Sequence, residues 1–173
     1  MKKHSGMRPH DIVILLKIAA KGNTPWYMKD LAIELGISAS EVSESLHRSA
    51  IAGLLSPDKK HLMVLSLLDF LQYGLRFVYP CIPGAKVRGL PTAHAAPPLS
   101  ETIVSEEPYV WPYAKGTVRG ESIEPLHAKL PEACLRDPLF YKYMALTDAL
   151  RVGRTREKVI AIKVLKELLA DGQ

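Results

Sequence analysis

The 173-residue chain has no long apolar run, and stretches such as residues 12–16 are only a handful of residues long. A membrane-spanning helix needs about 20 apolar residues, so the sequence predicts none. The basic start at residues 2–4 is not followed by the apolar stretch of a secretion signal. The simplest predicted location is therefore the cytoplasm, with no membrane partner.

Cysteine is also scarce, since Cys81 and Cys134 are too few for a disulfide framework. Together with His94 and His127 they lack the close spacing of zinc ligands. We therefore predict no metal site and expect both cysteines to be small buried hydrophobes. The sequence contains no glycine-rich phosphate loop and no local nucleophile motif. It predicts neither a cofactor nor an enzyme.

Charge and proline are distributed unevenly along the chain. The net charge of +5 suggests an anionic partner without proving one. Residues 1–65 carry a net charge of +3, residues 66–130 carry 0 and residues 131–173 carry +2. Of the 13 prolines, 10 lie between Pro80 and Pro138. This distribution predicts a mainly α fold with helical ends and a proline-rich middle.

The N-terminal part predicts consecutive helices. Pro9 suits the first position of a helix and Gly22 its end. This helix is apolar over most of its circumference, so we expect it at the centre of the core. Thr24-Pro25 predicts the start of a second helix, which ends at Gly36.

A tight turn at residues 36–38 leads into a third predicted helix that extends to about Ala52. Ser38 and Glu41 have the spacing of a capping box, in which each side chain accepts from the other residue's backbone N–H. Two helices joined by a tight glycine-containing turn are typical of the helix-turn-helix, whose second helix enters the DNA major groove.

A polar turn at residues 56–61 separates Leu54-Leu55 from residues 62–65, which predicts a short hairpin. Its basic tip would contact the DNA backbone beside the third helix, whose small hydroxyls allow close approach to phosphates and bases. The candidate DNA contacts are polar side chains of the helix and of the tip: Ser38, Ser40, Glu41, Ser43, Glu44, His47, Arg48, Lys59, Lys60 and His61.

Residues 31–43, with Leu46 and residues 52–55, resemble the pattern LAxxLGISxSxVSxxLxxLxxxGLL of winged helix-turn-helix proteins, particularly MarR-type bacterial transcriptional regulators. The resemblance covers residues 8–65. It implies a three-helix core with a two-stranded wing, a homodimer and binding to palindromic double-stranded DNA. The chain has Glu44 where many such proteins carry Arg or Lys. Because a carboxylate is repelled by phosphates although it can accept from cytosine, use of the fold for protein contact remains open.

The rest of the chain predicts a linking helix at residues 66–80, a proline-rich segment with short strands at 81–126 and a helical hairpin at 127–173. In the middle segment Val87-Arg88-Gly89 recurs as Val118-Arg119-Gly120, and we interpret the two as similar strand-and-turn elements. The hairpin consists of two helices joined by a short glycine turn, which we expect to pack antiparallel.

Residues 130–138 and 148–157 resemble the tail of uncharacterised bacterial winged-helix proteins. This resemblance implies a role as an antitoxin or regulator beside a nucleotidyltransferase-like protein. Weaker candidates for partner binding are the arginines of this half of the chain: Arg88, Arg119, Arg151, Arg154 and Arg156. They could bind an anion or an acidic partner, or they could tie segments together and compensate a helix dipole. The sequence thus predicts a homodimeric, sequence-specific DNA-binding regulator. The alternative is an antitoxin-like adaptor that binds a co-encoded protein.

Overall fold

The computed structural model describes residues 6–172, so the basic start at residues 2–4 lies outside the described residues. The chain is mostly helical, with a small three-stranded sheet in the middle. Its helices are α1 (Pro9–Lys21), α2 (Met28–Leu35), α3 (Ala39–Ile51), α4 (Val64–Asp69), α5 (Leu75–Val78), α6 (Leu130–Leu135), α7 (Pro138–Val152) and α8 (Thr155–Asp171). A π-helical stretch, Phe70–Gly74, joins α4 to α5. The strands are β1 (Lys86–Thr92), β2 (Tyr109–Pro112) and β3 (Val118–Ser122).

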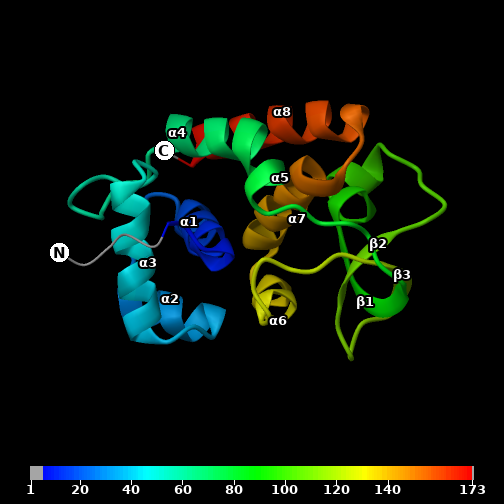
Figure 1. The fold of residues 1–173 in the computed structure, drawn as a ribbon, viewed down its shortest axis with the longest axis horizontal. Helices are drawn as coiled ribbons and strands as arrows, with labels where there is room; N and C mark the ends of the chain where they lie inside the picture. Colours follow the sequence, from blue (N-terminus) through cyan, green and yellow to red (C-terminus); the bar gives the residue numbers. More distant parts are fainter. Residues whose placement is uncertain (1–5, 173) are drawn as a thin grey trace.

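Helices α1–α3 lie at one end of the molecule and the sheet at the other, with α7 between them and α8 alongside α4 (Figure 1). The prediction of a central first helix is confirmed, because the side chains of residues 12–16 are fully buried. Pro9 occupies the first turn of α1 and the chain leaves the helix at Gly22, as predicted. A single cluster of buried side chains extends from α1 to α8.

Helix α2 begins later than the sequence indicates. Thr24-Pro25 lies in the preceding loop, and the residue before the helix is Tyr27, whose side chain makes no capping hydrogen bond. Trp26 packs against the core. This packing holds residues 24–27 as a loop, so the preference of proline for the first helical turn is not used here.

The helix predicted from Ser66 begins at Val64, which shortens the predicted hairpin. Only Leu55 and Leu62 form a β-bridge, and the Met63 N–H donates to the Leu54 carbonyl at 3.0 Å. From Val64 onward the chain is helical rather than extended because this turn buries the side chains of residues 67 and 68 against the core.

The repeated tripeptide pairs with itself in the sheet. Strands β1 and β3 are antiparallel, and their register places Arg88 directly opposite Arg119. The interpretation of the two tripeptides as similar strand elements is therefore confirmed. Their glycines allow β2 to approach closely, because a Cβ on Gly89 would lie 2.1 Å from the Trp111 carbonyl oxygen. Strand β2 also pairs with β3 in parallel, which closes the small sheet on itself.

A buried carboxylate fastens the sheet to α7. Asp148 is fully buried and accepts hydrogen bonds from Thr92 Oγ1 at 2.8 Å and Trp111 Nε1 at 2.7 Å. Arg151 lies beside it and donates to Asp148 at 3.1 Å and to the Tyr79 carbonyl at 2.9 Å. Arg151 is therefore an interior residue, which corrects its place among the candidate partner contacts.

Helices α7 and α8 form the predicted C-terminal pair. They are joined at Gly153, where a Cβ would lie 2.3 Å from the Ala149 carbonyl oxygen. At the start of α8 the Arg154 N–H donates to the Glu157 carboxylate, which caps the helix. Thr155 is the first residue of the helix and not its cap. Within residues 6–172 we find no helix that is both long and apolar enough to cross a bilayer.

Candidate nucleic-acid interface

The turn between α2 and α3 has the predicted chemistry. Gly36 ends α2 in the left-handed region, with φ of 64° and ψ of 36°, which a residue with a side chain rarely adopts. Ile37 is buried, and the Ser38 hydroxyl accepts from the Glu41 N–H at 3.2 Å. Half of the predicted capping box is therefore present, and α3 leaves the turn at a fixed angle to α2.

The Glu41 side chain is occupied elsewhere. Instead of capping the helix, its carboxylate lies 2.7 Å from Arg48 Nη2 and 2.8 Å from His10 Nε2, with Arg8 Nη1 at 3.3 Å. The hydrogen bond from Arg48 holds the pKa of Glu41 below its usual value. This carboxylate is therefore ionised and locally neutralised, and it does not add net negative charge to the outer face of α3.

Arg48 is an interior residue, which corrects its place among the exposed candidate contacts. Its side chain is 6% exposed, and its guanidinium donates to both carboxylate oxygens of Asp11, at 2.9 and 2.8 Å. Asp11 is itself fully buried in the first turn of α1. This two-point ion pair ties α3 to α1, which leaves the guanidinium no free face toward a nucleic acid.

The outward face of α3 is small and polar, and it carries no lysine or arginine side chain. Ser40, Ser43, Glu44 and His47 are all exposed. Glu44 makes no ion pair within the described part of the chain. The helix thus presents hydroxyls, an imidazole and one carboxylate, and these are groups that bond base edges or phosphates over short distances.

The loop at residues 55–62, which follows α3 in the sequence, carries basic side chains. Asp58 organises its tip, because its carboxylate accepts from the Ser56 hydroxyl and from the Lys60 N–H. Lys59 has a φ of 63°, and Lys60 and His61 are exposed. The loop therefore presents Lys60 and His61 on a structured turn, beside the half-buried Lys59.

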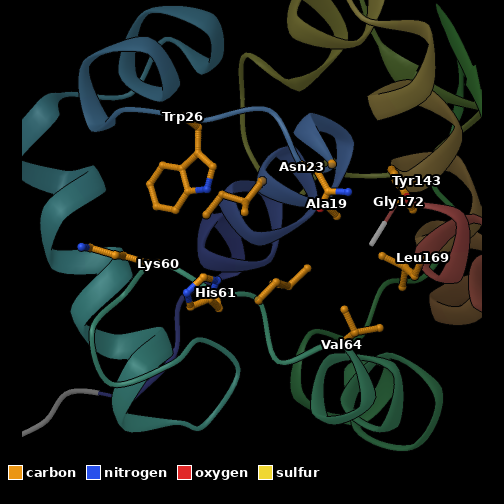
Figure 2. Close-up of a pocket in the computed structure, with 12 residues that line it drawn as sticks. Ala19, Asn23, Trp26, Lys60, His61, Val64, Tyr143, Leu169 and Gly172 are labelled. Atoms are coloured by element: carbon orange, nitrogen blue, oxygen red, sulfur yellow. The ribbon is translucent and has the colours of Figure 1, made fainter.

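A groove runs between the start of α2, α3 and the 55–62 loop. It has a volume of about 740 Å³, and its walls include Trp26, Ser43 and Lys60. A second cavity of about 320 Å³ shares Trp26, Lys60 and His61 with it and reaches Tyr143 and Leu169. Figure 2 shows Trp26 and His61 on one side of this second cavity and Tyr143 and Leu169 on the other. The loop is thus separated from α8 by open space.

The weaker candidates fall into two groups. Arg88 and Arg119 are exposed and directly opposite each other, so they do not tie the middle segment to the core. Arg154 and Arg156 are exposed beside a third cavity, of about 450 Å³, at the start of α8. Of the cysteines, Cys134 is buried as predicted, and burial raises the pKa of its thiol. Cys81 is only partly buried at the edge of the core, which corrects the prediction for that residue.

Sequence reasoning missed the interior partners of α3. Asp11 lies in a helix that is otherwise apolar on most faces, and this isolated acid is the feature that could have indicated a buried cation opposite it. It also missed His94 and Glu157, which line the third cavity from segments far apart in sequence. In comparisons of the chain with models of protein families, with curated proteins and with solved structures, nothing matched.

Proposed function

We propose that the protein is a cytoplasmic, sequence-specific DNA-binding regulator that acts as a homodimer, with residues 8–65 as a winged helix-turn-helix. In this proposal α3 enters the major groove and the 55–62 loop is the wing. The observation that carries it is the outward face of α3. Ser40, Ser43 and His47 are exposed on one helix, although the same helix is packed tightly against α1 on its other side.

The charges around α3 support this assignment. Since Arg48 and Arg8 together pair with the carboxylates of Asp11 and Glu41, only Glu44 opposes the approach of phosphate along the helix. Lys59 and Lys60 on the wing, with Lys29 at the start of α2, supply compensating positive charge. Phosphate contacts from flanking cations position a protein on DNA, whereas short polar side chains in the groove read bases.

A dimer is supported by exposed apolar side chains along α4, the π-helical stretch and α5. Leu65 is 79% exposed, Tyr73 67% and Phe77 72%. Large apolar side chains that are exposed along one continuous helical segment are candidates for a shared interface. Sedimentation equilibrium should give a dimer for the wild-type protein and a monomer for Phe77→Asp. A wild-type monomer at all concentrations would contradict this part of the proposal.

Selection of bound sequences from random double-stranded DNA, run at two salt concentrations, tests the proposal directly. We expect enrichment of one palindromic sequence and a steep loss of affinity at the higher salt, because binding releases counterions from the phosphates. Absence of any enriched sequence, or an affinity that does not change with salt, would refute it.

Paired variants then locate the contacts. Replacing Lys59 and Lys60 together by Ala should weaken binding to all sequences and reduce the salt slope by about 2, at about 0.9 per phosphate contact. Ser43→Ala should change sequence preference at one position and leave the slope unchanged. Lys166→Ala, on the exposed side of α8, is the matched control and should have neither effect.

The second candidate function is an antitoxin-like adaptor that binds a co-encoded protein. It is favoured by the like-charged pair Arg88 and Arg119, since two exposed arginines directly opposite each other on a sheet form a ready site for an acidic group. Deleting residues 81–126 cannot test this, because Val110 and Trp111 belong to the buried interior. Arg88→Glu with Arg119→Glu should abolish binding of the co-encoded protein and spare DNA affinity, whereas unchanged binding would refute the adaptor role.

A further inference from the structure

The third cavity, of about 450 Å³, lies where the small sheet meets the first turn of α8. It is built from segments that have no part in the proposed DNA contact, so its chemistry can be considered separately. The lining side chains that matter here are His94, Tyr109, Glu121, Arg154, Arg156 and Glu157. Ligand sites in proteins commonly have volumes of about 300–1,000 Å³.

His94 lines the cavity with one ring nitrogen left without a partner. Its side chain is 6% exposed, and its Nε2 lies 2.9 Å from the Glu107 carbonyl oxygen. A carbonyl only accepts, so Nε2 must carry the proton, and in the neutral ring Nδ1 is a bare acceptor. Nδ1 is buried and has no hydrogen-bond partner among the described residues. A buried polar atom of this kind calls for an explanation.

The carboxylate that faces Nδ1 is another acceptor. Glu157 uses one carboxylate oxygen to cap α8 through the Arg154 N–H, and its other oxygen, Oε1, lies 3.8 Å from His94 Nδ1. That separation is too long for a direct hydrogen bond. Because Nδ1 has almost no accessible surface, a donor reaches it only after a small shift of the neighbouring side chains, and an amino group then placed about 2.9 Å from each atom could donate to both. The floor of the cavity is therefore suited to an N–H donor.

Tyr109 borders the same site. Its ring packs edge-on against the His94 imidazole, with the centroids 4.6 Å apart. Burial raises the pKa of the Tyr109 hydroxyl, and the carboxylates of Glu121 and Glu157 raise it further. The phenol therefore keeps its proton at neutral pH and remains available as a hydrogen-bond donor.

The mouth of the cavity is positively charged, whereas its floor carries carboxylates. Arg154 and Arg156 are exposed, and neither guanidinium forms an ion pair within residues 6–172. Arginine binds phosphate and carboxylate groups with paired hydrogen bonds. A simple anion would be repelled by the carboxylates at the floor, and a polyamine would be repelled by the arginines. The site therefore fits a ligand with an anion at one end and an amino group at the other.

We propose that this cavity binds a nucleotide whose base carries an exocyclic amino group. The amino group lies between His94 Nδ1 and Glu157 Oε1, the base packs beside Tyr109, and the phosphate lies at Arg154 and Arg156. This site goes beyond the proposed DNA contact and does not depend on it, because its residues come from other segments of the chain.

Titration calorimetry on the full, DNA-free protein tests the proposal, with AMP as the probe. IMP, which has a carbonyl oxygen in place of the amino group, and adenosine, which lacks the phosphate, are matched ligands. We expect AMP to bind. IMP and adenosine should each bind at least about tenfold more weakly than AMP, because each leaves buried or charged groups of the protein unpaired. No AMP binding at millimolar concentration, or equal affinity for AMP and IMP, would overturn the proposal.

A surface variant locates the phosphate without disturbing the core. Arg156→Ala should weaken AMP binding about tenfold and keep the ratio of AMP to IMP affinity, because the floor is unchanged. Lys163→Ala, which removes the same charge from the exposed side of α8, is the control and should bind AMP as the wild type does. Equal loss in both variants would mean non-specific attraction and would refute the site. Since DNA is absent, failure here is distinguishable from failure of the regulator proposal.

Discussion

Removing the guanidinium of Arg48 is the sharpest test of how α3 is held. Arg48→Met keeps a long apolar side chain but leaves Asp11 fully buried without its guanidinium partner, and leaves Glu41 without its shortest partner. The change therefore breaks a buried ion pair from one side only. We expect it to destabilise the whole fold, because α1, the partner of α3, is the central helix.

The size of the loss follows from the burial of the pair. Removal of one partner from a buried ion pair costs about 3–5 kcal/mol. For a chain of this size about 1 kcal/mol corresponds to 2–4 °C in Tm, so Tm should fall by about 6–20 °C. Both atoms of the carboxylate are engaged, at 2.9 and 2.8 Å, which places the expected cost within that range rather than near the small values of surface pairs.

A second variant separates the ion pair from simple loss of packing. Asp11→Asn removes the acid but keeps an acceptor for the Arg8 N–H, which Asp11 binds at 2.8 Å to cap α1. The double variant Asp11→Asn with Arg48→Met removes both charges, so neither position keeps a buried charge without a partner. Its loss should be smaller than the sum of the two single losses, with a coupling energy of about 1–3 kcal/mol.

Urea unfolding followed by circular dichroism at neutral pH measures these differences. Ser43→Ala, on the exposed face of the same helix, is the control and should stay within about 0.5 kcal/mol of wild type. If Arg48→Met cost less than about 1 kcal/mol, or if the two single losses were additive, the reasoning that α3 is fixed by this pair would be wrong.

Three further outcomes are expected. The pKa of Glu41 is held below its usual value by Arg48, so the stability it contributes is present above the unfolded-state pKa and is lost as pH falls through the lower folded-state value. Glu41→Gln should therefore lose less stability than wild type between about pH 5 and pH 3 in urea titrations. Gly120→Ala places a Cβ 2.3 Å from the Pro108 carbonyl oxygen and should cost about 1–3 kcal/mol by overpacking, measured by thermal unfolding. Trp111→Phe removes the N–H that Asp148 accepts at 2.7 Å and should cost about 1.5–3 kcal/mol; a neutral result in the same assay would contradict the anchoring role of Asp148.

Local chemistry made the α2–α3 region predictable. Gly36 at a left-handed position and Ser38 at a helix N-terminus interact only with residues a few positions away. Short sequence patterns therefore predict the turn and the cap directly. The paired tripeptides were recognisable as strands for a similar reason, because each contains a β-branched residue followed by Arg and Gly. The register between the two strands was not predictable, because it depends on how the chain between the two tripeptides, which are 31 residues apart, folds.

The interior position of Arg48 depended on a contact that no local pattern contains. Asp11 lies 37 residues earlier, and a helix periodicity read by itself assigns most polar residues to the solvent side. Ser45 and Ser49 are also buried on this helix. A polar residue flanked by buried serines on an otherwise amphipathic helix is thus as compatible with an interior ion pair as with a nucleic-acid contact.

The pairing of Glu41 with Arg48 determines which residues can contribute to affinity and which to base preference in the proposed DNA complex. With Glu41 paired to Arg48 and Arg8, the exposed unpaired charge of α3 among the described residues is Glu44, and the electrostatic contribution of the helix side chains is unfavourable. Attraction to phosphate must then come from flanking cations such as Lys60, which act over a Debye length of about 8 Å at physiological salt. The salt dependence of binding would reside in the wing, whereas base preference would reside in Ser43 and His47. Affinity and specificity are therefore expected to respond to different substitutions.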